Sequence, residues 1–263
     1  MARVFGYEDV GNHATMLVDA VRMRAFSEAI RRSVRPDDVV VDVGAGSGVL
    51  ALLCAKAGAR RVFAVERGSM ALLIESAARQ NGVADVVRVI RGDARTVPFD
   101  EPPTLIVSEM IGSFAIDEDY LGLLGAVRAR CAPGCRTLPA SVEIELALAA
   151  IPELEEEVAT VRGGLGVRLD DLATAFQSRV ALTWVDADCL VSPATPATRV
   201  AVGDRPPRAI GGAVVARRAA RANAIVGWFN SELVPGVTLT SNPAQAMTHW
   251  AHLVFPLEPT LDV

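Results

Sequence analysis

The sequence predicts an α/β domain that contains a parallel sheet, followed by a second, β-rich domain. Strand-like and helix-like segments alternate between Asp38 and Glu109, and this alternation is typical of a parallel sheet with helices on both faces. After Pro139 the pattern changes to segments in which apolar and polar residues alternate, as in antiparallel strands with one buried face. We therefore expect one domain over residues 1–138 and a second over residues 139–263.

The first domain is expected to contain four buried strands joined by helices. The strands are predicted within the segments "DDVVVDVGAGSG", "RRVFAVE", "VVRVIRGDA" and "TLIVSE". Apolar residues at helical spacing predict helices in "VLALLCAKAGA" and in "SMALLIESAARQNG". The lead-in "NHATMLVDAVRMRAFSEAIRRSV" has similar spacing, so we expect one or two further helices before the first strand.

The second domain is expected to be built from antiparallel strands, with one helical interruption. Strand-like alternation occurs in "SVEIELAL", "AIVGWFNSEL" and "GVTLTS". The segment Pro152–Val180 instead has helical character with a glycine break.

Composition excludes several classes of partner. The net charge is −5, and no basic block with interleaved aromatic residues occurs, so we expect no nucleic-acid partner. No stretch approaches the roughly 18 uncharged apolar residues of a membrane span, and the N-terminus has no apolar signal core. We expect no membrane partner and a cytoplasmic location. The four cysteines are scattered and lack nearby histidines, so no metal site is expected.

A glycine-rich turn and two acids lie at the ends of successive predicted strands. Gly44, Gly46 and Gly48 follow the first strand and precede a helix, which lets the backbone approach a ligand at the helix N-terminus. Glu66 ends the second strand, where an acid accepts hydrogen bonds from ribose hydroxyls. Asp93 ends the third strand, where an adenine amino group would lie. This arrangement predicts an adenosine-containing ligand.

The identity of that ligand depends on the glycine spacing and on Asp42. Dinucleotide enzymes usually space their glycines as GxGxxG, and Gly48 comes one residue too early for that pattern. Asp42, before the turn, is suited to hold an amino-acid ammonium group. The turn therefore resembles the S-adenosylmethionine site of class I methyltransferases, which have a Rossmann-like fold. A nicotinamide-dependent oxidoreductase remains an alternative.

Two carboxylates occupy a mostly apolar segment after the fourth strand. Glu109 and Glu118 lie near the two ends of "SEMIGSFAIDE". A buried strand that ends in an acid delivers that side chain to the sheet edge where ligands bind. Two exposed acids that only cap a helix are the alternative.

Four segments together resemble the protein arginine methyltransferase family. They are the two-glutamate segment "SEMIGSFAIDE", the N-terminal "GNHATMLVDAVR", the "AKAGARRVFAVE" unit and the "THW" of Thr248–Trp250. The resemblance spans almost the whole chain. It implies S-adenosylmethionine as cofactor, and a Rossmann-like domain followed by a partial β-barrel.

The resemblance also implies a role for individual residues. Glu109 and Glu118 would clamp the nitrogen group of the acceptor, while His249 would pair with Asp19. Tyr7, Met110 and Trp250 would contact the acceptor. The cofactor would be held by His13, Met16, Arg22, Asp42, Gly44, Gly46, Glu66, Asp93 and Ala94.

The clamp also follows from chemistry. A guanidinium arrives charged, because its pKa is near 12.5 or above. Two carboxylates can bind it bidentately and draw positive charge away from the attacking nitrogen. The product proton would leave through a glutamate or through the His249–Asp19 pair.

The sequence departs from the family's pattern at four places. Only Tyr7 of an aromatic N-terminal motif is in place, and Met110 and Ile111 replace the usual pair after the first glutamate. Arg95 stands where an acid often contacts adenine. The chain also ends thirteen residues after Trp250, so we expect an incomplete or differently closed barrel.

The sequence leaves more than one possibility for the oligomeric state, for the methyl acceptor and for whether the chain is an enzyme. Residues 152–180 lie where the family carries a helical dimerisation arm, so a homodimer is expected; a helical cover on the chain's own barrel is the alternative. The acceptor is expected to be a guanidine or amine nitrogen of a protein or peptide, or of a small metabolite. A cofactor-binding scaffold subunit without activity is a further hypothesis.

Overall fold

The computed structural model describes residues 10–115, 119–164, 166–201, 204, 207 and 209–263. The chain divides into two compact units. The first comprises Met1–Val142 with Val200–Pro206 and Ser231–Leu239, and the second comprises Glu143–Arg199, Pro207–Asn230 and Thr240–Val263.

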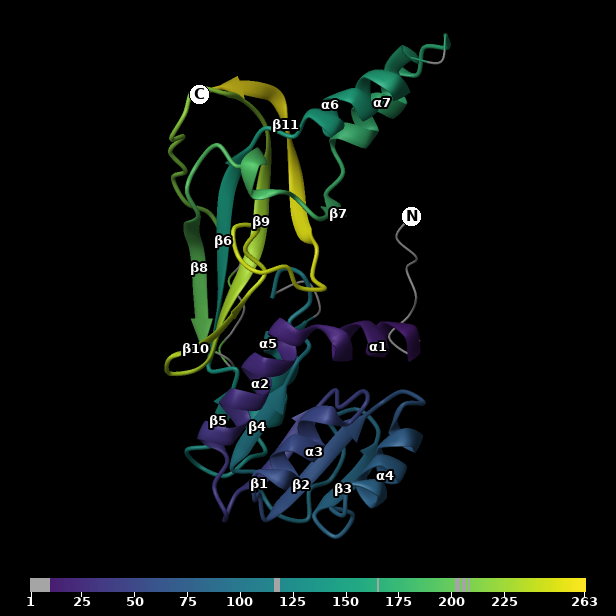
Figure 1. The fold of residues 1–263 in the computed structure, drawn as a ribbon, viewed down its shortest axis with the longest axis vertical. Helices are drawn as coiled ribbons and strands as arrows, with labels where there is room; N and C mark the ends of the chain where they lie inside the picture. Colours follow the sequence, from purple (N-terminus) through teal and green to yellow (C-terminus); the bar gives the residue numbers. More distant parts are fainter. Residues whose placement is uncertain (1–9, 116–118, 165, 202–203, 205–206, 208) are drawn as a thin grey trace. The chain divides into compact units, whose positions relative to one another are not determined.

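The first unit is built on a five-stranded parallel sheet in the order β3-β2-β1-β4-β5 (Figure 1). The parallel pairing confirms the predicted α/β architecture. All five residues of β1 are buried, as expected for a central parallel strand with both faces covered. The strands are β1 (Val39–Val43), β2 (Arg61–Glu66), β3 (Val87–Arg91), β4 (Leu105–Ser108) and β5 (Arg136–Leu138).

Helices connect and cover these strands. Two helices precede the sheet, as the lead-in predicted, and α3 and α4 lie over strands β1 to β3 in Figure 1. The helices are α1 (Val10–Val18), α2 (Ala20–Ser33), α3 (Val49–Lys56), α4 (Ala71–Gln80) and α5 (Tyr120–Arg128). Among the described residues, no helix is long and apolar enough to cross a membrane.

The strand order determines where a ligand can bind. From β1 the chain passes to β2 and β3 on one side, and then returns to β4 on the other side of β1. The carboxyl ends of β1 and β4 therefore flank the point where the order reverses, which is where open α/β sheets bind ligands.

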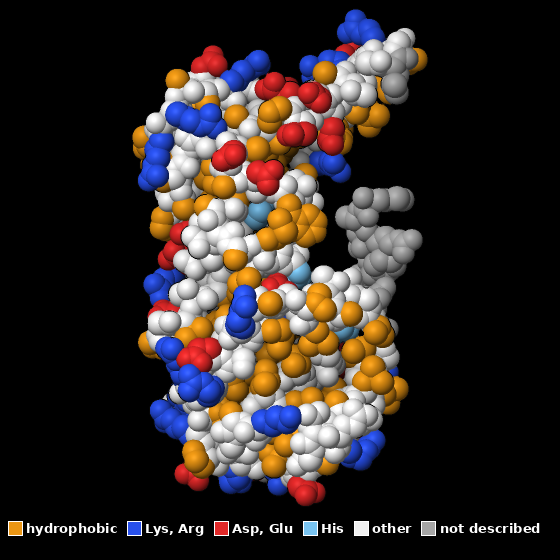
Figure 2. All heavy atoms as spheres, in the orientation of Figure 1, with side chains coloured by type: hydrophobic (Ala, Val, Ile, Leu, Met, Phe, Trp, Pro, Cys, Tyr) orange, Lys and Arg blue, Asp and Glu red, His pale blue; other side chains and the backbone are white. Residues whose placement is uncertain are grey.

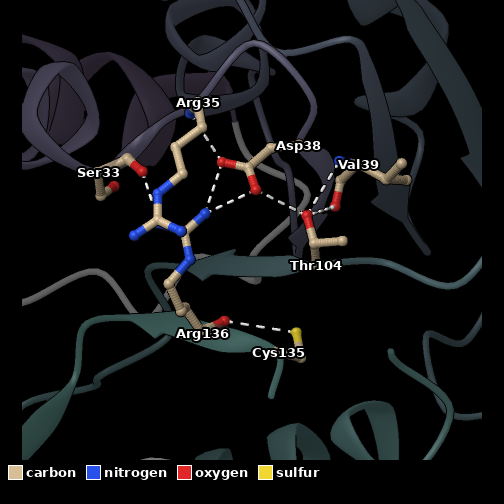
Figure 3. A network of polar contacts seen from close by, with 7 residues as sticks. All are labelled: Ser33, Arg35, Asp38, Val39, Thr104, Cys135 and Arg136. Atoms are coloured by element: carbon tan, nitrogen blue, oxygen red, sulfur yellow. Dashed lines mark hydrogen bonds and ion pairs between the residues drawn. The ribbon is translucent and has the colours of Figure 1, made fainter. Parts of the chain in front are cut away.

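A polar network ties the opposite edge of this sheet together (Figure 3). The buried carboxylate of Asp38, just before β1, accepts hydrogen bonds of 2.6 Å from Nη2 of Arg136 and 2.7 Å from the Thr104 hydroxyl. Arg136 also donates to the carbonyl oxygen of Ser33 at 2.6 Å. Burial favours the neutral acid, but the hydrogen bonds from Arg136 and Thr104 outweigh it and lower the pKa of Asp38.

The second unit contains most of a six-stranded sheet in the order β7-β11-β9-β6-β8, with β10 paired to β9. β11 is antiparallel to both β7 and β9, in line with the predicted β-rich half. The strands are β6 (Ser141–Ala149), β7 (Ala181–Thr183), β8 (Thr195–Ala201), β9 (Arg221–Val234), β10 (Val237–Thr240) and β11 (His252–Asp262), and a short helical turn, η2, spans Ala187–Cys189.

Small and aromatic side chains pack on one face of this sheet. Trp228 is fully buried beside Ala147 and Val254, and its indole N–H donates to Glu145 at 2.7 Å. His252 is also buried. Its Nδ1 accepts from the Val185 N–H at 2.9 Å, so its Nε2 donates to the Ser241 carbonyl oxygen at 2.8 Å.

The predicted helical interruption of the second unit is present. It consists of α6 (Pro152–Ala159), a π-helical turn η1 (Thr160–Gly164) and α7 (Asp170–Gln177), which pack on one another. Glycines 163, 164 and 166 mark the expected break. We call Pro152–Gln177 the arm.

Candidate active site

The glycine-rich turn after β1 has the backbone that its sequence predicts. Gly44 and Gly46 have φ values of +70° and +52°, a conformation that favours glycine. A Cβ atom on Gly46 would lie 2.7 Å from Cε1 of His13, and one on Gly44 would overlap the sulfur of Met110. The turn therefore lies directly against two side chains that the sequence assigned to cofactor and acceptor.

Glu66 links the end of β2 to this turn. Its carboxylate accepts a hydrogen bond of 2.8 Å from the Gly46 N–H and one of 2.6 Å from the Gly68 N–H. A carboxylate held by two backbone donors is fixed in orientation. The ribose contact that the sequence assigned to Glu66 stays a prediction.

Asp42 is the buried acid of β1. It accepts a hydrogen bond of 2.9 Å from the Ala51 N–H in the first turn of α3. Burial raises its pKa to about 7, against the effect of that hydrogen bond, and the charges of Glu66 and Glu109 add to the rise. The Asp42 carboxyl group therefore gains or loses its proton near neutral pH.

Glu109, at the tip of β4, is held by Arg22 of α2. Nε and Nη2 of Arg22 both approach Oε2 of Glu109, at 2.8 and 2.6 Å, and both side chains are about 95% buried. Arg22 Nη1 also donates to the carbonyl oxygen of Met16 at 3.1 Å. Such a pair is stable only when both charges remain matched, so it fixes Glu109 at the predicted ligand edge.

A small cavity of about 40 Å³ brings many of the predicted site residues together. α1 contributes to its wall although no residue of α1 is fully buried. The predicted residues that line it are His13, Met16, Arg22, Gly44, Gly46 and Glu109.

Asp93 and Ala94 lie after β3. Ala94 is buried, whereas the Asp93 carboxylate is about 41% exposed and accepts from the Arg95 N–H at 2.9 Å. Arg95, where the family often has an acid, also forms an ion pair of 2.6 Å with Asp119. Both Asp93 and Arg95 therefore have partners, and the assignment of the adenine contact stays a prediction.

Asp19, His249 and Trp250 are not among the residues that line this cavity. Asp19 caps α2 by accepting from the Arg22 N–H at 3.0 Å. His249 and Trp250 belong to the second unit, where Trp250 is buried edge-on against Phe229 with ring centroids 5.0 Å apart. The pairing of His249 with Asp19 therefore stays a prediction. Tyr7 and Glu118 lie outside the described residues.

Sequence reasoning missed two polar residues in the β4–α5 region. The buried Ser108 hydroxyl donates to the Val43 carbonyl oxygen at 2.8 Å and joins the ends of β4 and β1. Tyr120, the first residue of α5, is fully buried. The signals were present, because Ser108 adjoins Glu109 and Tyr120 is one of only two tyrosines in the chain.

The chain is similar in sequence to several known methyltransferases. Residues 19–121 match the family model of the TRM5/TYW2 methyltransferase domain. A probable protein arginine N-methyltransferase 6 of Arabidopsis thaliana is 35% identical over 156 residues, covering 58% of this chain and 36% of that protein. Protein arginine N-methyltransferase 1 of Oryza sativa subsp. indica is 28% identical over 269 residues, covering 98% of this chain and 70% of that protein. The chain is thus similar in sequence to protein arginine N-methyltransferases over nearly its whole length, at under 30% identity.

The likeness to these protein arginine N-methyltransferases extends to the fold. A chain of the Trypanosoma brucei PRMT1 enzyme-prozyme heterotetrameric complex with AdoHcy superposes with a TM-score of 0.92 at 23% identity, covering 98% of this chain and 86% of that one. The Rossmann-like domain followed by a β-rich domain is therefore confirmed.

Proposed function

We propose that this chain is an S-adenosylmethionine-dependent N-methyltransferase that methylates a guanidine nitrogen of a protein. The observation that carries the proposal is the buried Arg22–Glu109 pair, which places a carboxylate at the tip of β4, beside the glycine turn. The names of the relatives and the match to a methyltransferase domain support it.

The residues around the turn fit the proposed cofactor. The glycine backbone at Gly44 and Gly46 leaves no room for a Cβ atom, which is typical of a turn that must approach a ligand closely. Glu66 would hold the ribose and Asp42 the ammonium group of the methionine part. Arg22 would meet its carboxylate, while His13 and Met16 would cover it.

The chain's own residues would then prepare the acceptor. S-adenosylmethionine, when bound, supplies an electrophilic methyl group. Glu109, together with Glu118, would bind the acceptor guanidinium and concentrate its positive charge on the nitrogens that are not attacked. A glutamate or the proposed His249–Asp19 pair would receive the proton that the product loses. The carboxylates also hold the guanidinium in one orientation, which lowers the entropic cost of reaction.

Methyl transfer from labelled S-adenosylmethionine tests this proposal. The acceptors are an arginine-rich protein, free arginine and peptides with free amines. We expect label on the protein, and loss of at least about 100-fold in rate in Glu109→Gln, because one pre-organised charge is removed. Glu75→Gln, on the exposed surface of α4, is the matched control and should keep the full rate.

Results other than label on the protein would each point to a different function. Label only on free arginine or on amines would replace the protein acceptor by a small-molecule or peptide-amine acceptor. Binding of S-adenosylhomocysteine without transfer to any acceptor would favour a non-catalytic scaffold subunit. Binding of a nicotinamide dinucleotide instead would contradict the proposed cofactor.

We propose that the chain forms a homodimer through the arm. Val167, Leu169 and Leu172 are exposed there, and Figure 2 shows hydrophobic side chains among charged ones over this part of the molecule. Exposed apolar clusters of this kind mark protein interfaces. Sedimentation velocity should give twice the mass of one chain, and Leu172→Asp should give a monomer. Val215→Asp, also exposed but outside the arm, is the control. A monomeric wild type would refute the dimer.

A further inference from the structure

Tyr120 carries a buried hydroxyl group that has no hydrogen-bond partner. The residue is 0% exposed. Among the described residues, three buried side-chain polar atoms lack a partner: Ser33 Oγ, Arg61 Nε and the Tyr120 hydroxyl. A polar atom that is buried without a partner is costly, so each one requires an explanation. Phenylalanine would fill the same volume without this cost.

The position of Tyr120 separates it from the other two atoms. Ser33 ends α2 beside Arg136, the first residue of β5, and Arg61 begins β2. Both therefore lie at the amino ends of the parallel strands, away from the glycine turn. Tyr120 begins α5, directly after the connection that starts at Glu109, and so lies at the carboxyl edge of the sheet.

One further observation links Tyr120 with Glu109, and a second concerns the segment between them. Burial raises the pKa of Tyr120, and the nearby charge of Glu109 raises it further. The phenol therefore stays protonated at neutral pH. The connection between the two residues also contains Ala115 with a φ value of +60°, which is strained for alanine, and strained residues concentrate at functional sites.

A phenol hydroxyl can donate one hydrogen bond and accept another at the same time, which neither a guanidinium nor an ionised carboxylate can do. A guanidinium has only donors and an ionised carboxylate has only acceptors, whereas a phenol has one donor and an oxygen that accepts. We propose that Tyr120 is an acceptor-binding residue: when the acceptor is bound, its O–H donates to the Glu109 carboxylate and its oxygen accepts from an N–H of the acceptor guanidinium. This inference rests on the proposed function and adds a specific residue to its acceptor site.

The test uses Tyr120→Phe in the full chain. Binding of a peptide that contains a single arginine is measured by calorimetry with S-adenosylhomocysteine present, alongside steady-state methylation. We expect peptide affinity and kcat/KM to fall at least 10-fold. The affinity for S-adenosylhomocysteine should not change, and Tm should stay equal or rise, because the variant loses an unpaired hydroxyl.

Ser231→Ala is the matched control, because it removes a buried hydroxyl that donates to the Ser141 carbonyl oxygen at 3.1 Å. Ser231→Ala should lower Tm and leave peptide affinity unchanged. Tyr120→Phe should instead keep or raise Tm and lower peptide affinity. Unchanged peptide affinity in Tyr120→Phe would overturn the inference. A lower Tm with weaker cofactor binding would also overturn it, because the hydroxyl would then be structural.

The same measurements separate failure of the Tyr120 inference from failure of the proposed methyltransferase function. If wild type binds the cofactor but methylates no acceptor, the proposed function fails. If wild type methylates the arginine peptide and Tyr120→Phe does so equally well, only the Tyr120 inference fails.

Discussion

Arg22 and Glu109 form a buried ion pair through a single carboxylate oxygen. Both Nε and Nη2 of Arg22 contact Oε2 of Glu109, and among the described residues Oε1 accepts no hydrogen bond. The two residues are 87 positions apart in the chain. One oxygen therefore fixes the carboxylate, and the proposed acceptor would bind the other.

Removing Arg22 should destabilise the protein strongly. Arg22→Met leaves the Glu109 charge buried and unpaired, so the free energy of unfolding should fall by about 3–5 kcal/mol. The double variant Arg22→Met with Glu109→Gln should lose less than the sum of the two single losses. Urea denaturation measures all three. The exposed Glu28–Arg31 pair is the control, and Arg31→Met should leave the free energy of unfolding almost unchanged.

Alanine at Gly44 should damage cofactor binding specifically. The left-handed backbone costs a non-glycine residue about 1–2 kcal/mol, and the new Cβ atom would displace Met110 into the site. Gly82→Ala is the matched control, because Gly82 has φ +68° but no atom near its Cβ position. Both variants should lose stability in urea, Gly44→Ala at least as much as Gly82→Ala. Only Gly44→Ala should lose affinity for S-adenosylhomocysteine, as measured by calorimetry. Equal affinities would contradict a ligand at this turn.

Cofactor binding should release a proton from Asp42. Its pKa is about 7, so at pH 6 the free protein holds the acid mostly protonated. The ammonium group of the cofactor favours the ionised form, which lowers this pKa on binding. Calorimetry in two buffers of different ionisation enthalpy should therefore detect about one proton released at pH 6 and almost none at pH 8. Asp42→Asn should abolish this difference; if the difference persists, another group is responsible.

The Asp38 network should contribute to stability and not to binding. Asp38→Asn removes the charge that Arg136 contacts, so the free energy of unfolding should fall by about 1.5–3 kcal/mol at pH 7. The folded-state pKa of Asp38 is lowered, so this stabilisation is fully present above the unfolded pKa of about 3.9 and is lost as pH falls through the folded value. Urea titrations at pH 7 and pH 3 should show the difference between wild type and variant shrinking at the lower pH. Affinity for S-adenosylhomocysteine at pH 7 should not change.

The elements of the first unit were predictable because buried parallel strands have a strong local signal. β1 is almost entirely valine and ends in glycines. In the second unit, β6, β9 and β10 were visible in their alternation, and the arm was visible in its helical spacing. β8 and β11 were not predicted, because each contains proline, which weakens a strand signal. Short elements such as β5 and β7 were missed, because three residues carry too little pattern to separate a strand from a loop.

The candidate site was predictable as a set of residues but not as a set of contacts. Residue types and spacing singled out Gly44, Glu66 and Glu109. No local pattern indicates that Arg22 would pair with Glu109, because that contact depends on how α2 packs beside β4. Tyr120 was missed for a similar reason, since a tyrosine in a mostly apolar helix resembles an ordinary core residue and only burial shows that its hydroxyl lacks a partner.

The most direct single measurement is mass spectrometry of an arginine-rich protein after incubation with S-adenosylmethionine and either wild type or Glu109→Gln. Methyl groups on arginine side chains after incubation with wild type, and none after incubation with the variant, are the predicted result. Tm and S-adenosylhomocysteine affinity of the variant establish that it is folded. No methylarginine from the wild type, or equal amounts from both proteins, would contradict a guanidine acceptor bound by Glu109.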